Sequence, residues 1–408
     1  MKRQFDDDGF EFDRLILLGG AYRGLTDVGE VLVALDQVTD GDHESWITAF
    51  TAVADRLGAQ ADASTAAGRT ASARSANLRA SSYYATAASH AATGEDAQRI
   101  LTLWNHHRDR WDAAVASFDP PVEKIAIPYE GTTLEGYFFH ADPSAGRDGA
   151  TGPRPTVILN NGSDGPVCDM WGSGGAAAVE RGWNAITFDG PGQGAALYRQ
   201  KLYFRADWEQ VITPVVDHLL TRDDVDPARL ALLGVSQAGY WVPRAAAFEH
   251  RLAACIADPG VMQVDTSWRS HLPDVMTQLL DTGDQKDFDA FMEAGMKDKP
   301  EALAELRWRM APYGTASFYE AYEAAGEQTL DAATVAKISC PLLITSPEHE
   351  QFWPGQSQQM HEAAPGSTLV AFTEAEGADW HCEPAARGLR DERICDWLAG
   401  VFDAVGTA

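Results

Sequence analysis

A serine at the end of a short apolar run carries the strongest chemical signal in the sequence. Gly234, Ser236 and Ala238 have the spacing of a G-x-S-x-G nucleophile elbow, with alanine in place of the second glycine. An elbow needs small neighbours, because its strained strand-to-helix turn brings strand and helix close together. We predict that Ser236 is a nucleophile, and the alternative is a structural serine in a turn.

A serine hydroxyl is a weak nucleophile, so it needs a general base and an acid that orients the base. On an elbow-type sheet these follow the serine in the order acid, then histidine, each after a late strand. Residues 342–345 predict one such strand, and Glu348 and Glu350 follow it; residues 369–372 predict the next, and His381 follows that. We predict His381 as the base and Glu350 as the acid. Glu348 remains the alternative acid. The other interpretation of His381 and of both glutamates is an ordinary solvated position in a loop.

Acyl chemistry also requires donors for the oxyanion that develops on the substrate. The backbone N–H of Gln237, directly after the nucleophile, is one expected donor. The second is expected from the loop after residues 156–159, at Ser163 or Asp164, because the glycines beside them permit a turn whose N–H groups face the site. A plain tight turn is the alternative for this loop.

Three other features fail as cofactor or metal sites. The turn at 188–194 is rich in glycine but lacks both G-x-G-x-x-G spacing and the lysine of a phosphate-binding loop. His349-Glu350 begins like a zinc-binding H-E-x-x-H motif, but residue 353 is Trp, and the adjacent His106 and His107 point to different helical faces. We therefore predict no cofactor and no metal.

The elements that must position these residues fall into four segments. Residues 1–118 read as a helical N-terminal, cap-like domain, which ends before Pro120 and Pro121. Residues 119–260 and 338–408 alternate short apolar runs with helical stretches, after a predicted hairpin around Glu130-Gly131. This alternation predicts an α/β fold with a mostly parallel sheet covered on both faces. Residues 261–337, helical and rich in Met and aromatic side chains, are too long for a simple crossover and predict an inserted lid.

Composition excludes several classes of partner. The chain has 408 residues, with 32 basic and 60 acidic side chains and a formal net charge of −28, which disfavours nucleic acid and anionic membranes. The apolar run at 15–18 is too short for a membrane span or a signal peptide. Five scattered cysteines without a C-x-x-C pair indicate a reduced, cytoplasmic protein. Whether the chain forms a homodimer is left open.

The chain resembles the α/β-hydrolases, and within them the group of FrsA-like esterases, 2,6-dihydroxypseudooxynicotine hydrolase and polyketide-shortening hydrolases. The resemblance rests on four motifs: the turn at 188–194, the elbow at Ser236, the acid turn at 347–356 and the loop at 377–382. It implies an eight-stranded sheet, a Ser-His-acid triad and N-terminal helices packed over the site. In the pseudooxynicotine-type members an acidic side chain of the oxyanion turn helps to cleave a carbon–carbon bond beside a ketone. Asp164 occupies the corresponding place here, one carbon shorter than glutamate.

Several aromatic residues are candidates for binding a small substrate. The resemblance places the helix that carries Tyr83 and Tyr84 against the site, and helix packing is the equal alternative for both. Trp171, Trp241 and Trp353 neighbour the proposed catalytic loops, although tryptophan also fills cores.

We therefore predict a serine hydrolase that cleaves a carbon–carbon bond next to a ketone, or an ester, in a small aromatic or polyketide-like substrate. A general carboxylesterase and a non-catalytic ligand-binding protein on a hydrolase scaffold are the alternatives.

Overall fold

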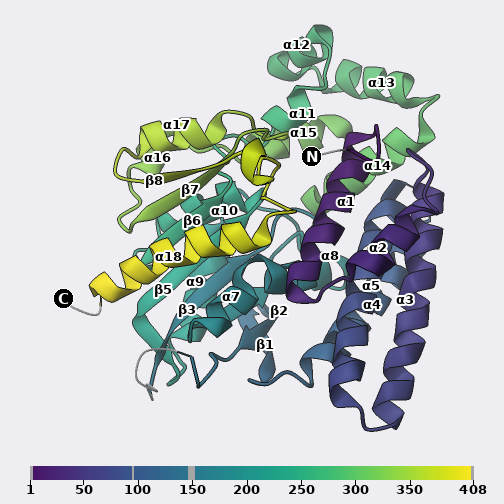
Figure 1. The fold of residues 1–408 in the computed structure, drawn as a ribbon. Coiled ribbons are helices and arrows are strands. Elements are labelled where there is room, and N and C mark those ends of the chain that lie inside the picture. Colours follow the sequence, from purple (N-terminus) through teal and green to yellow (C-terminus); the bar gives the residue numbers. More distant parts are fainter. Residues whose placement is uncertain (1–2, 94–95, 146–151, 406–408) are drawn as a thin grey trace.

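The apolar runs of the sequence assemble into one eight-stranded sheet in the computed structural model, which describes residues 3–93, 96–145 and 152–405. The strand order is β1-β2-β4-β3-β5-β6-β7-β8, in which β1–β2 and β2–β4 are antiparallel and the remaining pairs are parallel. This arrangement confirms the predicted mostly parallel sheet (Figure 1). The strands are β1 (Val122–Tyr129), β2 (Thr132–Phe139), β3 (Arg154–Asn160), β4 (Asn184–Phe188), β5 (Val225–Val235), β6 (Ala254–Asp258), β7 (Leu342–Pro347) and β8 (Thr368–Phe372).

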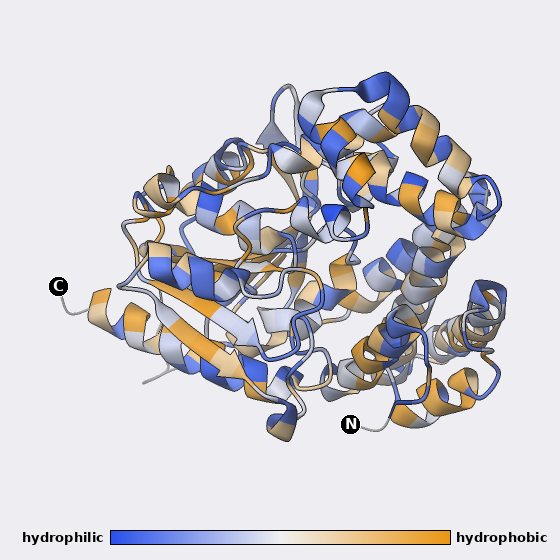
Figure 2. Cartoon of the chain, turned by 90° about the horizontal axis from the view of Figure 1, so that it is seen from above, coloured by the Kyte–Doolittle hydropathy of each residue, from blue (hydrophilic) through white to orange (hydrophobic). Residues whose placement is uncertain are grey.

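Both faces of the sheet are buried, as its continuous apolar strands require. Neighbouring residues of β3 join opposite clusters: Ile158 packs on one face, and Val157 and Leu159 pack on the other. Figure 2 shows hydrophobic colouring along the strands and mixed colouring on the surrounding helices. One face is covered by α9 (Glu209–Leu219), α10 (Ala238–Ala246), α16 (Ala332–Val335) and α17 (Gln356–Ala363), the other by α6 (Val167–Met170), α7 (Ala176–Glu180) and α18 (Arg387–Val405).

The N-terminal part is helical and has its own apolar cluster beside the sheet (Figure 1). The helices are α1 (Asp8–Gly20), α2 (Val28–Leu35), α3 (His43–Ala66), α4 (Thr70–His90) and α5 (Ala97–Val115). Gly68, whose φ is 69°, lets the chain reverse between two of these helices, α3 and α4. The buried Arg108 of the last N-terminal helix, α5, donates to Asp189 after β4 at 2.5 Å, which ties the N-terminal helices to the sheet.

A second group of helices lies between β6 and β7 in the chain, where the sequence indicated an insertion. Met276, Phe288, Met292 and Tyr322 pack there into a separate small core, whereas Phe291 is exposed. Figure 1 shows these helices together at one end of the molecule. They are α11 (Thr266–Arg269), α12 (Asp274–Thr282), α13 (Gln285–Met296), α14 (Pro300–Met310) and α15 (Phe318–Gly326).

The remaining short helix, α8 (Gly194–Tyr198), starts at the glycine-rich turn after β4. Asp189 accepts the N–H of Ala195 at 2.9 Å, and a side chain at Gly194 would meet Asp189 at 2.5 Å. The turn is therefore a tight strand-to-helix connection. Within the described ranges, no helix is long and apolar enough to cross a membrane.

Candidate active site

Three side chains from loops far apart in the sequence form a hydrogen-bonded chain. The Nε2 of His381 lies 2.9 Å from the Oγ of Ser236, and its Nδ1 lies 2.8 Å from Glu350 Oε2 and 2.9 Å from Oε1. The side chains of His381 and Glu350 are only 3% and 6% exposed. A neutral imidazole in this place can accept the serine proton while the carboxylate orients its other nitrogen.

The elbow at Ser236 has the strained geometry that its sequence predicted. Ser236 has a φ of 61°, and its N–H donates to the Asp258 carbonyl at the end of β6, at 2.7 Å. A Cβ on Gly234 would lie 2.5 Å from the Ala238 carbonyl oxygen, and one on Gly239 would lie 1.8 Å from the Pro259 carbonyl oxygen. The buried Ala238 fits, so the second obligatory glycine is Gly239.

Asp258 supports this elbow with its side chain as well as its backbone. Its carboxylate accepts from Thr345 Oγ1 at 2.6 Å and from the buried Arg390 Nε at 2.5 Å. The end of β6 is thereby joined to β7 and α18, the elements on either side of the loops that carry Glu350 and His381. No local pattern in the sequence marked this support.

Glu350, rather than Glu348, meets the histidine. Its Oε1 also accepts the N–H groups of Phe352 and Trp353 at 3.0 and 3.1 Å. Burial alone would raise the pKa of Glu350, but His381 and the two backbone donors outweigh burial and hold the pKa below its ordinary value. Glu348 is exposed and accepts the N–H of Glu374 at 2.9 Å.

The acid turn and the histidine loop are fastened to each other beyond this contact. The N–H of His349 donates to the Asp379 carbonyl at 2.8 Å, and the N–H of His381 donates to Gln351 Oε1 at 3.0 Å. These two bonds fix the separation of the turns, and with it the contact between acid and base.

The predicted oxyanion turn lies beside the nucleophile. A Cβ on Gly162 would be only 2.7 Å from the Cβ of Ser236, so only glycine permits this approach. Asp164, two residues further, is exposed, and its carboxylate acts on Arg309 of α14. The negative charges of Asp164 and Glu305 hold the pKa of Arg309 above its ordinary value. The turn thus contacts Ser236 at Gly162, and the charge of its Asp164 acts on the inserted helices.

The predicted aromatic residues have different surroundings. Tyr83 and Tyr84 are buried among the N-terminal helices, where their hydroxyls contact Asp27 and Glu30, and Asp55 respectively, so their placement favours the helix-packing alternative. The partly buried Trp171 stacks on Phe139 against the core, and the fully buried Trp241 stacks on Trp208 within it, so both pack with the core.

Of the predicted tryptophans, Trp353 lies beside the reactive groups, with its ring centroid 5.6 Å from that of His381. Two phenylalanines that the sequence did not indicate share this surface. The centroids of Phe352 and Phe12 lie 4.8 and 6.1 Å from that of His381. Phe12 belongs to α1, so the N-terminal helices reach the histidine directly.

The inserted helices reach the other side of the nucleophile. The side chain of Gln237 donates to Gln328 Oε1 at 3.0 Å and lies 3.4 Å from the hydroxyl of Tyr313, and Trp241 Nε1 donates to Gln328 at 2.9 Å. Tyr313 follows α14 and Gln328 follows α15. These contacts place the proposed lid against the residue after Ser236, and no sequence motif had identified them.

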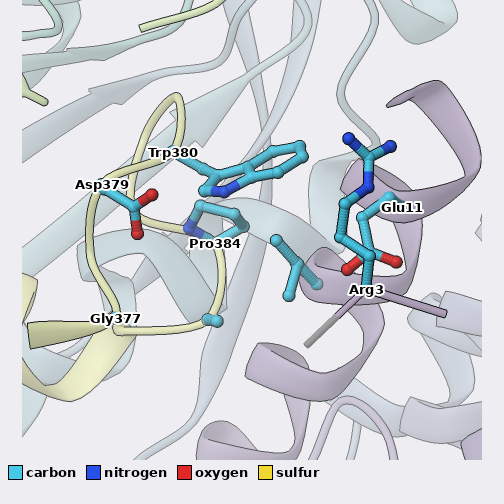
Figure 3. A pocket seen from close by; sticks show the side chains of 8 residues that line it. Arg3, Glu11, Gly377, Asp379, Trp380 and Pro384 are labelled. Atoms are coloured by element: carbon cyan, nitrogen blue, oxygen red, sulfur yellow. The ribbon is translucent and has the colours of Figure 1, made fainter. Parts of the chain in front are cut away.

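A pocket lies where the N-terminal segment meets the loop of His381 (Figure 3). Arg3 and Glu11 line it from one side, and Trp380 and Pro384 line it from the other. Ser236, Glu350 and His381 are not among its lining residues. The pocket therefore belongs to the packing of α1 on the histidine loop. Over the described portion of the chain, no group of three or more His, Cys, Asp or Glu side chains is arranged to hold a metal.

Comparison with known proteins identifies the class to which this fold and site belong. No family model matches the chain. The α/β hydrolase xenA of Xenoacremonium sinensis is 31% identical over 88% of this chain and 85% of its own length. The chain belongs to the α/β hydrolases and is a hydrolase, which confirms the family resemblance seen in the sequence.

Individual relatives extend the similarity to the whole chain. The hydrolase LUC6 of a Fusarium species is 29% identical over 98% of each protein. The crystal structure of 2,6-dihydroxy-pseudo-oxynicotine hydrolase has a TM-score of 0.72 at 20% identity, covering 94% of this chain and 95% of that one. AbyA5 has a TM-score of 0.62 at 14% identity, covering 98% and 99%. Both structures share the fold, including its N-terminal helices.

Proposed function

We propose that the chain is a serine hydrolase that works through an acyl-enzyme. The observation that carries the proposal is the buried chain from Ser236 Oγ through His381 to Glu350, with heavy-atom distances of 2.8 to 2.9 Å. Each member lies within hydrogen-bond reach of the next, which proton transfer to a base requires. The strained φ of Ser236 adds to this support, because backbone strain at an elbow is kept where function needs it.

The reaction follows from these positions. His381 takes the proton of Ser236 as the hydroxyl oxygen attacks a carbonyl carbon, and Glu350 stabilises the imidazolium that forms. The tetrahedral intermediate then collapses to the acyl-enzyme, and His381 delivers its proton to the departing group. Water, activated by the same histidine, releases the acyl group as a carboxylic acid and restores the serine.

The proposed substrate is a small aromatic or polyketide-like molecule, cleaved at a carbon–carbon bond next to a ketone or at an ester. A 1,3-diketone would give a carboxylic acid and a ketone, because the leaving enolate must take a proton on carbon. An ester would give the same acid and an alcohol. Two similar proteins, 20-hydroxy-prefusarin hydrolase FUS2 of Gibberella moniliformis and 2,6-dihydroxy-pseudo-oxynicotine hydrolase, are named for small organic molecules, which supports a substrate of this size.

Carbon–carbon cleavage is the first choice because an acid stands in the oxyanion turn. Asp164 lies two residues after Gly162, whose built Cβ would be 2.7 Å from the Cβ of Ser236, and from this turn its carboxylate would assist a leaving group that is protonated at carbon. A general carboxylesterase is the second candidate, because an alcohol leaving group needs only the proton that His381 carries.

The five cysteines, all in the described part of the chain and all unpaired, support a reducing, cytoplasmic location.

The test compares the unmodified protein with Ser236→Ala. A fluorophosphonate probe should label the unmodified protein once and should leave Ser236→Ala unlabelled, and hydrolysis should be lost with the label. Full labelling of Ser236→Ala would overturn the proposal. Incubation with paired aryl esters and aryl 1,3-diketones, followed by mass analysis of the products, then identifies the bond. Cleavage of the esters alone would leave the carboxylesterase as the function.

A further inference from the structure

The turn that approaches Ser236 is held by a glutamine from another loop. Gln193, in the glycine-rich turn after β4, is 5% exposed. Its Nε2 donates to the carbonyl oxygens of Asn161 and Gly162 at 2.8 and 2.6 Å. Its Oε1 accepts the N–H of Gly190 at 2.9 Å, which fixes the orientation of the amide. Both polar atoms of this side chain are thus bonded, and its Nε2 holds two successive carbonyl groups.

The direction of a carbonyl group fixes the direction of the next N–H. A peptide unit is planar and trans, so the N–H of Ser163 points away from the carbonyl of Gly162. Because Gln193 holds that carbonyl, the N–H of Ser163 faces the opposite side of the turn. Gly162 itself lies against Ser236, with 2.7 Å between the position of a built Cβ and the serine Cβ. The peptide therefore presents a donor next to the nucleophile.

The N–H that precedes Ser163 in the turn is less suited to the role of oxyanion donor. The N–H of Gly162 already donates to Asn161 Oδ1 at 2.8 Å. By contrast, the N–H groups of Ser163 and Gln237 make no hydrogen bond to any other residue that the structure describes. Two uncommitted donors on either side of a serine hydroxyl are what a developing oxyanion requires.

We propose that Gln193 is a positioning residue, which holds the Gly162–Ser163 peptide so that the N–H groups of Ser163 and Gln237 form the oxyanion hole. This inference rests on the proposed function and assigns the second donor to Ser163 rather than Asp164. Without Gln193 the peptide is free to rotate. A carbonyl oxygen turned toward the site would repel the negative charge that the hole must bind.

The variant Gln193→Leu removes both bonds to the carbonyl groups at similar side-chain volume. Gln200→Leu is the matched control. Gln200 follows α8, and its side-chain amide also donates to a backbone carbonyl, that of Thr133, at 2.9 Å. We expect Gln193→Leu to lower kcat for an aryl ester by about 10²- to 10³-fold, with KM within about threefold, since oxyanion donors act on the transition state. Gln200→Leu should keep both constants within about twofold.

An aryl trifluoromethyl ketone separates positioning from general loosening. Its adduct with Ser236 carries an oxyanion in the hole, so its Ki should rise by the factor by which kcat/KM falls in Gln193→Leu. If Gln193→Leu does not fold, Gln193→Glu decides, because a carboxylate of the same shape cannot donate to the two carbonyl groups. Gln193→Glu should also show a fall in kcat/KM and an equal rise in the Ki of the ketone.

Two results would overturn the assignment to Gln193. One is a folded Gln193 variant with kcat within about threefold of the unmodified protein. The other is a fall in kcat/KM while the Ki of the trifluoromethyl ketone stays constant. Ser236→Ala distinguishes this failure from failure of the proposed function: if Ser236→Ala is inactive and Gln193→Leu is fully active, only the role of Gln193 is wrong.

Discussion

At the scale of single residues, the acid beside His381 is the position that the sequence left open. Glu350 is buried and bonded to the imidazole, whereas Glu348 is exposed and bonded to a backbone N–H. The two glutamates lie in one turn and differ by two positions. They therefore form a natural pair for separating an orienting role from a surface role.

Replacing Glu350 by glutamine should lower kcat by about 10²- to 10⁴-fold, because a neutral amide neither fixes the tautomer of His381 nor stabilises its cation. Glu348→Gln is the control and should stay within about twofold. The measurement is kcat on an aryl ester for both variants, with circular dichroism to verify folding. Equal activity of the two variants would assign the orienting role to another group.

The residues that the sequence located are those whose position follows from short-range pattern. Ser236 sits between a strand and small residues, and His381 and Glu350 follow strands in an order set by the sheet. Phe12, Gln193 and Gln328 could not be found in this way. They contact the site through residues 31 to more than 300 positions away. Phe12 and Gln328 lie in no motif, and the glycine-rich turn that contains Gln193 marked a tight turn but gave no sign that this side chain reaches the loop after β3.

At the scale of elements, α1 is pressed against the loop that carries the histidine. A Cβ built on Gly19 would lie 1.7 Å from the carbonyl oxygen of Pro384, a backbone atom that cannot turn aside. Phe12, two turns earlier, faces His381 and stacks on Trp380. The close approach of helix and loop therefore depends on a glycine in the last turn of α1.

Gly19→Ala should destabilise the protein although alanine is the better helix former. The gain in helix propensity is about 1 kcal/mol, and the clash costs about 1 to 3 kcal/mol or more because backbone must move. Gly295→Ala in α13, where a Cβ meets nothing within 4 Å, is the matched control and should stabilise slightly. Urea unfolding measures both. A stability of Gly19→Ala equal to that of Gly295→Ala would contradict the packing described here.

The element pattern was also where sequence reasoning was most reliable. The predicted runs at 156–159 and 342–345 became strands because each alternates between two buried faces. Residues 1–118 were predicted only to be helical, because a single glycine, Gly68, gave little warning of the reversal between α3 and α4. Only packing of α3 on α4 decides that the chain turns there.

At the scale of the whole molecule, stability should depend on pH through a buried histidine remote from the catalytic residues. His107 of α5 is 1% exposed and lies 2.9 Å from Ser81 Oγ on α4. Burial, with a smaller effect of the neighbouring Arg108, lowers the pKa of His107 from 6.5 to about 4. Between these values the unfolded chain binds the proton and the folded chain does not, so stability falls as pH falls below 6.5.

From pH 7.5 to 5.5, this one group should remove about 1.4 kcal/mol from the free energy of unfolding. Both pH values lie above the sequence pI of about 4.6, so the protein keeps a net negative charge, which prevents precipitation. Urea titrations of the unmodified protein and of His107→Gln at the two pH values measure the difference. If His107→Gln loses as much stability as the unmodified protein over this interval, the histidine is not responsible.

The contact of Phe12 with His381 has a consequence for the time at which activity begins. Synthesis makes Phe12 long before His381. Until the histidine loop has been made, the elbow serine has no base beside it and α1 lacks the loop on which it packs. We therefore expect hydrolysis to begin only after the histidine loop has packed on α1, so that chains still lacking this loop are inactive.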